Sequence, residues 1–218
     1  PSIDLKDALT QPIKSHRKSI TDPAEVGPLM AAIKNYQATP VVMAALQLSP
    51  LFLCRPGELR HLEWAEVNFA EARIELPASK MKTKEPHIIP LASQAIAILK
   101  ELQPISGRGK YVFPSARGAS RPLSDNGVRT ALRTLGYTND QICPHGFRAM
   151  GRTILDEVLN FPVDWIEHQI AHSVKDVNGR AYNRTKHLPQ RKKMMQAWAD
   201  YLDGLANGNN NFLPFKSH

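Results

Sequence analysis

An apolar segment at Val41–Cys54 constrains the fold of this chain more than any other stretch of its sequence. It is too short to cross a bilayer, which requires about 20 apolar residues. We therefore expect a buried, central helix over Val41–Leu53. Proline and glycine break this helix and open a short one through Leu62, so Arg55 lies at a tight junction between two helices.

Elsewhere the pattern indicates helices around one small sheet. Extended, β-branched character at Arg73–Leu76 and His87–Leu91 predicts two antiparallel strands, and the polar stretch SKMKTKEP between them predicts a lysine-bearing hairpin. The fold class is therefore mainly α with a small antiparallel β-sheet (α+β). The other predicted helices are Pro23 to about Tyr36 behind a capping Thr21 or Asp22, Ser93–Leu102, Asp125–Leu135, Gly146–Leu159, Val163–Ile170 and Leu188–Leu205.

The charge balance favours a polyanionic partner. Among 218 residues, 28 are Lys or Arg and 20 are Asp or Glu, giving a net charge of +8. A basic surface attracts nucleic acid, although charge alone leaves other partners open. Cys54 and Cys143 have neither disulfide-framework nor zinc-site spacing. Since the N-terminal residues also lack a signal-peptide pattern, we expect reduced thiols and a cytoplasmic location, with no membrane partner.

Two pairs of residues are spaced to bind a phosphate. Glu58 follows Arg55 by one turn and could orient its guanidinium, leaving donors in a rigid fork suited to a phosphate. His145 and Arg148, in HGFR, share one face of a helix start, where backbone N–H groups favour an anion. Each pair alone is equally compatible with an ordinary surface role.

The remaining candidates are lysines of the hairpin and residues near the C-terminal end. Lys80, Lys82 and Lys84 lie in SKMKTKEPH, and their positions alone do not select one for proton donation over non-specific DNA contact. His172 lies in IAHS, and Tyr182 follows ten residues later. Tyrosines are usually core or interface residues, but the neighbouring Arg180 and Arg184 would favour a phenolate beside a phosphate.

In this order, the motifs resemble the tyrosine recombinase family. Prophage and genomic-island integrases in particular have sequences similar to RPGELRHLEW, HGFR and AYNR followed by MMQAWADYLD. Each motif is common by itself, and the order and spacing of six carry the resemblance from about Ile20 to Leu205. The chain departs from the family pattern in Cys54, where a small or apolar residue is more usual, and in IAH, where many members have LGH. Neither departure removes a catalytic group.

The resemblance implies a DNA recombinase that needs no cofactor or metal. It implies that Tyr182 forms a 3′-phosphotyrosine, that Arg55 and Arg148 clamp the phosphate, and that Lys82, eight residues before the proline of the next strand, protonates the leaving oxygen. His145 would assist as acid/base and His172 would donate a hydrogen bond to the phosphate. The other implied contributions are support from Glu58 and DNA contacts from Lys80, Lys84, Arg180 and Arg184.

The resemblance also implies double-stranded DNA as the partner and a homotetramer on DNA, with a possible monomer in isolation. We expect a linker over residues 1–20, a catalytic domain over 21–206 and a disordered tail over 207–218. Since the family usually adds N-terminal DNA-binding domains, the chain is expected to be an excised catalytic domain. The alternatives are a type IB topoisomerase, a catalytically inactive prophage relic that only binds DNA, and a purely structural basic protein.

Overall fold

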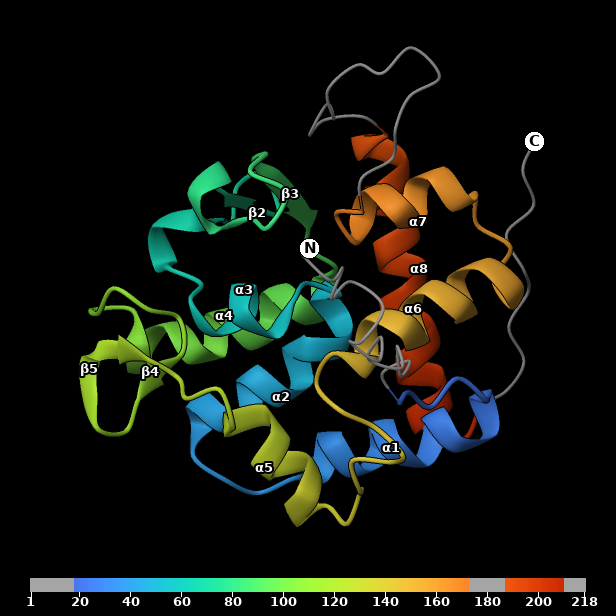
Figure 1. Ribbon diagram of the computed structural model, residues 1–218, viewed down its shortest axis with the longest axis horizontal. Coiled ribbons are helices and arrows are strands. Elements are labelled where there is room, and N and C mark those ends of the chain that lie inside the picture. Colours follow the sequence, from blue (N-terminus) through green and yellow to red (C-terminus); the bar gives the residue numbers. More distant parts are fainter. Residues whose placement is uncertain (1–17, 173–186, 210–218) are drawn as a thin grey trace, which may run out of the picture.

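The apolar segment forms α2 (Pro40–Phe52), which contacts helices from both halves of the chain. The computed structural model describes residues 18–172 and 187–209, and Figure 1 shows α2 at the centre of its helices. The helices around α2 are α1 (Pro23–Asn35), α3 (Pro56–Arg60), α4 (Ser93–Ser106), α5 (Gly127–Thr134), α6 (Gly146–Glu157), α7 (Val163–Gln169) and α8 (Leu188–Ala206). The mainly helical prediction is confirmed, because all of these helices occur where the sequence predicts them.

The predicted antiparallel sheet is present and has one additional strand. Its order is β1 (Val67–Asn68), β2 (Arg73–Leu76) and β3 (His87–Pro90), and Ile74 pairs with Ile89. All four residues of β3 are buried. The connection from β2 to β3 carries the lysines and contains a short 3-10 turn, Ala78–Lys80. The sheet thereby presents the lysine hairpin beside α3.

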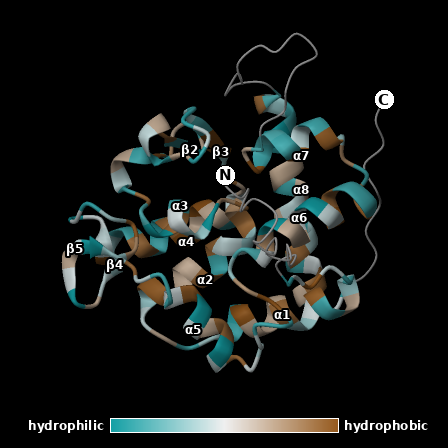
Figure 2. Cartoon of the chain, viewed as in Figure 1, coloured by the Kyte–Doolittle hydropathy of each residue, from teal (hydrophilic) through white to brown (hydrophobic). Residues whose placement is uncertain are grey.

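A second hairpin was not predicted from the sequence. It pairs β4 (Pro114–Ser115) with β5 (Gly118–Pro122) and lies at the edge of the molecule in Figure 1. Its strands consist of Pro, Ser, Gly, Ala and Arg, which have low β-propensity and give no alternating apolar signal. Figure 2 shows hydrophilic residues on β5 and apolar ones along α2.

The C-terminal helix α8 packs closely on α1 and α2. Trp198 is fully buried, and its Nε1 donates to the carbonyl of Pro50 (2.9 Å). A Cβ added at Gly27 in α1 would lie 2.9 Å from the carbonyl oxygen of Leu205, so this close approach requires glycine. The last helix is therefore part of the core.

The chain contacts the helical domain before residue 21, where the catalytic domain is predicted to begin. Ser19 Oγ donates to the carbonyl of Gly146 (2.7 Å), and Ile20 is buried, so the chain already packs against the domain within the predicted linker. Residues 207–209 follow α8, while 1–17 and 210–218 lie outside the described residues. Among the helices of the described ranges, none has the length and apolar character needed to cross a bilayer.

The fold should lose stability at acidic pH through His87. Burial first, and then the positive charge of Arg191, lower the pKa of His87 to about 3, below the roughly 6.5 of an unfolded histidine. Between these two values only the unfolded chain binds the proton. The stabilisation is complete above about pH 6.5 and declines towards pH 3, by at most about 1.4 kcal/mol per pH unit.

Urea denaturation of wild type and His87→Gln between about pH 7 and about pH 4 measures this contribution. We expect a shallower pH dependence in the variant, because glutamine does not titrate. Parallel curves for the two proteins would contradict the assignment.

Candidate active site

A cavity of about 480 Å³ brings together residues from four separate segments of the chain. The segments are the α2–α3 junction, the β2–β3 hairpin, the start of α6 and the turn after α7. Its lining consists of Arg55, Lys82, Thr83, His145, Arg148, Ala171 and His172. Five of the six predicted catalytic residues therefore line one cavity.

Arg55 is held in place by Glu58 and by the turn after α7. One oxygen of the Glu58 carboxylate accepts from the Arg55 backbone N–H and the other from its guanidinium, both at 2.7 Å. The second terminal nitrogen of Arg55 donates to the carbonyl of Ala171 (3.3 Å). This is the orientation by Glu58 that the spacing of the two residues suggested.

Arg148 is buried, with 4% of its surface exposed. Its two terminal nitrogens donate to the carbonyls of Leu53 (2.6 Å) and Ile170 (2.5 Å). Burial, and then the nearby charge of Arg55, lower the pKa of the Arg148 guanidinium, although arginine stays protonated in proteins. Two cations therefore lie side by side, which leaves the cavity strongly positive.

Two of the carbonyls that hold these arginines belong to residues with unusual backbone conformation. Leu53 (φ 54°) and Ala171 (φ 49°) are left-handed although neither is glycine. Such a conformation costs about 1 kcal/mol or more. Leu53 ends α2 and accepts from Arg148, and Ala171 follows α7 and accepts from Arg55. The strained turns thus point their carbonyls at the two guanidinium groups.

The two histidines occupy different positions around the cavity. His145 is the N-cap residue of α6, where the helix dipole favours an anion. His172 is half exposed, and its Nδ1 lies 2.6 Å from a carboxylate oxygen of Glu167. A carboxylate accepts hydrogen bonds, so Nδ1 carries the proton and the ring orientation is fixed by Glu167. Arg152 holds the other oxygen of Glu167 (3.0 Å).

The three hairpin lysines have different surroundings. Lys80 Nζ contacts Glu63 (2.8 Å), Glu66 (2.7 Å) and the carbonyl of His61 (2.9 Å), which occupies its three donor positions. The hydrogen bond from Lys80 lowers the pKa of Glu63. Lys82 lines the cavity, whereas Lys84 lines an adjoining hollow of about 350 Å³. Lys80 and Lys82 line that hollow as well. Lys82 is thus the hairpin lysine that lines the cavity, and the DNA contacts predicted for Lys80 and Lys84 stay predictions.

Sequence reasoning missed two residues of the site. Thr83 lines the cavity, and its only sequence signal is its position next to Lys82. Glu167 orients His172 from five residues earlier in the chain. The sequence carries no signal for this pair, because side chains on one helix face are three or four residues apart. Tyr182, Arg180 and Arg184 lie outside the described residues, so their predicted roles stay predictions.

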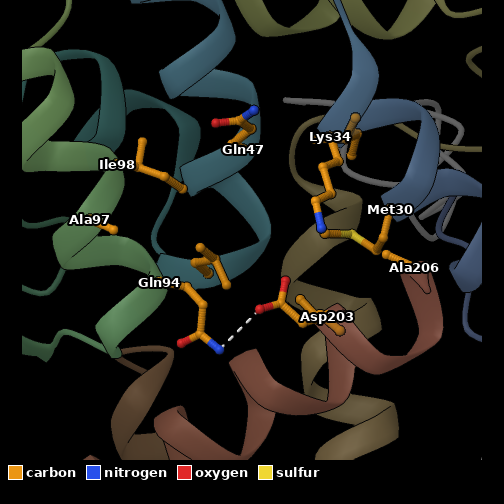
Figure 3. Close-up of a pocket in the computed structure, with 11 residues that line it drawn as sticks. Met30, Lys34, Gln47, Gln94, Ala97, Ile98, Asp203 and Ala206 are labelled. Atoms are coloured by element: carbon orange, nitrogen blue, oxygen red, sulfur yellow. Dashed lines mark hydrogen bonds between the residues drawn. The ribbon is translucent and has the colours of Figure 1, made fainter. Parts of the chain in front are cut away.

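A second cavity, of about 310 Å³, lies between α1, α2, α4 and α8 (Figure 3). Apolar side chains such as Met30 and Ile98 dominate its wall, and Gln94 donates to Asp203 (3.1 Å) beside it. Lys34 is its basic residue and Asp203 is its acidic one. Without a surplus of positive charge, this cavity is a weaker candidate for binding a phosphate than the arginine-lined one.

The arginine-lined cavity is suited to bind and polarise a phosphate. Fixed guanidinium donors stabilise charge that develops on phosphoryl oxygens, and the start of α6 adds its dipole. Within residues 18–172 and 187–209, no three His, Cys, Asp or Glu side chains gather as ligands for a metal ion.

The chain matches known proteins in sequence. Residues 20–187 match the model of the phage integrase family. The chain belongs to that family. It is 36% identical over 217 residues to the integrase of Enterobacteria phage P4, covering 93% of this chain and 49% of that integrase. It is 32% identical over 209 residues to the prophage integrase IntA of Escherichia coli K12, covering 96% and 50%.

Solved structures of other integrases share the fold. A lambda integrase dimer bound to a COC′ core site matches with a TM-score of 0.56 and 20% identity, over 81% of this chain and 53% of that one. A lambda integrase tetramer bound to a Holliday junction matches with a TM-score of 0.56 and 19% identity, over 81% and 53%. The phage integrase relatives are about twice as long as the region that this chain matches.

Removing the charge of Glu58 should destabilise the fold. Glu58→Gln leaves Arg55 and Arg148 adjacent without the carboxylate, and breaking a buried ion pair from one side costs about 3 kcal/mol. The free energy of unfolding from urea denaturation measures the loss. As a matched control, Glu71→Gln removes an exposed carboxylate 3.6 Å from Arg73 and should cost less than about 1 kcal/mol. Equal losses in the two variants would contradict the prediction.

Proposed function

We propose that this domain breaks and rejoins DNA through a 3′-phosphotyrosine, with Tyr182 as the nucleophile. The convergence of Arg55, Lys82, His145, Arg148 and His172 on one cavity carries the proposal. Such a set can neutralise a single phosphodiester from several directions. Membership of the phage integrase family supports the same reaction.

Arg55 and Arg148 are proposed to clamp the non-bridging oxygens of the scissile phosphate. Negative charge gathers there as the pentavalent transition state forms, and donors already fixed in place stabilise it without reorganisation. Their contacts to Glu58, Ala171, Leu53 and Ile170 provide that fixation. Losing one such donor costs on the order of 10²-fold in rate.

The proposed reaction needs two proton transfers. The Tyr182 phenol oxygen attacks phosphorus while the bond from phosphorus to the 5′-oxygen breaks. His145 accepts the phenol proton, and Lys82 gives a proton to the leaving 5′-oxygen. In the second step a 5′-hydroxyl from a partner strand attacks phosphorus and the phenol leaves, with the protons returning. The phosphodiester energy stays in the covalent link, so no nucleotide is consumed.

His172 is proposed to donate a hydrogen bond to the same phosphate. With Nδ1 engaged by Glu167, the other ring nitrogen is the one available to a ligand. That nitrogen donates only in the form of the ring in which both nitrogens carry hydrogen. Glu167 therefore acts through His172, as Glu58 acts through Arg55.

The DNA backbone is proposed to continue from the cavity along the lysine hairpin. The adjoining hollow shares Arg55 and Lys82 with the cavity and adds Lys80 and Lys84. Because Lys80 is paired with Glu63 and Glu66, Lys84 is the stronger candidate contact to a neighbouring phosphate. Arg180 and Arg184 remain proposed DNA contacts on the basis of their position beside Tyr182. Double-stranded DNA with attachment sites is the proposed substrate.

Four copies of the domain are proposed to act together on two duplexes. Strand exchange requires a 5′-hydroxyl from one duplex to reach a phosphotyrosine on another. The lambda integrase structure of the same fold is a tetramer bound to a Holliday junction, which supports this stoichiometry for the present chain.

The nucleophile is tested with a nicked DNA substrate carrying the attachment sequence, in which the released strand diffuses away. We expect wild type to give a covalent protein–DNA band on a denaturing gel and Tyr182→Phe to give none, because only the phenol can form the link. A band of equal intensity from both proteins would refute Tyr182 as the nucleophile.

Two further outcomes separate the alternatives. Adduct formation with relaxation of supercoiled DNA but no recombinant product would favour a topoisomerase. Specific binding without any adduct would favour an inactive DNA-binding protein.

The general acid is tested by changing the leaving group. Lys82→Ala should lose about 10²-fold or more of its cleavage rate on ordinary DNA. It should regain near wild-type rate on a 5′-bridging phosphorothiolate, because a thiolate leaves without a proton. Lys84→Ala and Lys80→Ala are the matched controls and should show no such selective rescue. Rescue of Lys84→Ala in place of Lys82→Ala would move the role to the neighbouring lysine.

A further inference from the structure

Arg191 is a buried cation that the proposed reaction does not use. It lies in the first turn of α8 on the stripe that also contains Met195, Trp198 and Leu202, and none of its surface is exposed. Burying a guanidinium among apolar side chains costs several kcal/mol unless its donors find partners. The contacts of Arg191 must therefore offset the desolvation cost of its guanidinium.

The contacts of Arg191 tie α8 to α7 and to β3. Its Nε (3.1 Å) and one terminal nitrogen (2.9 Å) both donate to the side-chain oxygen of Gln169. The same terminal nitrogen donates to the carbonyl of Ile88 in β3. Gln169 is itself buried; its amide nitrogen donates to the carbonyl of Phe52 (3.4 Å), and its own carbonyl accepts from His87 Nε2 (3.0 Å).

This network directly adjoins the groups that hold the two arginines of the cavity. Gln169 precedes Ile170 and Ala171, whose carbonyls accept from Arg148 and Arg55. Phe52 precedes Leu53, whose carbonyl is the other acceptor for Arg148. Every carbonyl that holds a cavity arginine is therefore one or two residues from an atom of this network.

We propose that Arg191, acting through Gln169, is a positioning residue for DNA cleavage. It fixes the turn at 170–172, and through that turn it sets the directions of the Arg55 and Arg148 guanidinium groups. It also joins that turn to the helix that follows the segment containing Tyr182. The inference rests on the proposed function for its effect on cleavage, while its effect on the arginines can be measured without cleavage.

A control for general destabilisation is available in the same helix. Trp198 is also fully buried, and it also donates a hydrogen bond to a backbone carbonyl, that of Pro50. The Pro50 carbonyl does not belong to the 170–172 turn or to the Phe52–Leu53 pair. Trp198→Phe therefore removes a buried hydrogen bond of α8 without touching the positioning contacts.

The experiment compares wild type, Arg191→Met, Gln169→Met and Trp198→Phe. Methionine fills much of the volume of either side chain and removes the hydrogen bonds. Three quantities are measured: the single-turnover rate of covalent adduct formation at saturating DNA, the Kd for DNA, and the Nε–Hε NMR signals of Arg55 and Arg148.

We expect Arg191→Met and Gln169→Met to lower the adduct rate by about 10²-fold, the loss that a displacement of about 1 Å produces. The Kd should change far less than the rate, because DNA contacts are spread over the surface. The NMR signals of Arg55 and Arg148 should shift in both variants. Trp198→Phe should keep the wild-type rate within about threefold and leave those two signals in place, whatever its thermal stability.

Each outcome has one meaning. If both methionine variants behave as Trp198→Phe does in rate and in NMR signals, the positioning role is refuted. If Arg191→Met does not fold, Gln169→Met decides by the same criteria. If wild type gives no adduct on a verified site, the proposed function fails, and the arginine signals alone then decide whether Arg191 positions the guanidinium groups.

Discussion

The burial of the Arg148 guanidinium is the interaction on which the candidate active site depends. Removing this cation from water costs several kcal/mol, and two charge-assisted hydrogen bonds offset that cost. The acceptors are Leu53, 95 residues away in the chain, and Ile170, 22 residues away. The ends of α2 and α7 must therefore pack against α6 before the Arg148 guanidinium can donate to both carbonyls. The cavity is thus a consequence of how the helices pack.

Carboxylates hold two of the basic side chains of this site in place. Glu58 binds the guanidinium of Arg55, and Glu167 binds the imidazole of His172. Glu63 and Glu66 instead both form ion pairs with Lys80 in the hairpin. The β2–β3 hairpin therefore carries one lysine that is paired with carboxylates, Lys80, and one that lines the cavity, Lys82. The positive face of the cavity results from the placement of acidic residues as much as from the excess of basic ones.

The cavity residues were selected by the order and spacing of six motifs that resemble the tyrosine recombinase family, since each motif alone fits an ordinary surface role. The helices and the sheet, in contrast, were predicted from local pattern. The apolar stretch before Arg55 and the β-branched character of the two strands are visible within short windows. The fate of Lys80 and the burial of Arg191 depend on contacts with segments distant in sequence, which no short window contains. The β4–β5 hairpin was not predicted for another reason: its residues have low β-propensity and show no alternating apolar pattern. Arg191 did leave one clue, a charge on the apolar stripe of α8.

The contact between Gln169 and Arg191 has a topological consequence. These residues are 22 apart, and the segment containing Tyr182 lies between them. The described chain stops at His172, just after the turn whose carbonyls accept from Arg148 and Arg55, and resumes at His187, before a helix that contacts Gln169 through Arg191. Docking of α8 and orientation of the arginine pair therefore belong to one packing event, because they share the side chain of Gln169 and the turn that follows it.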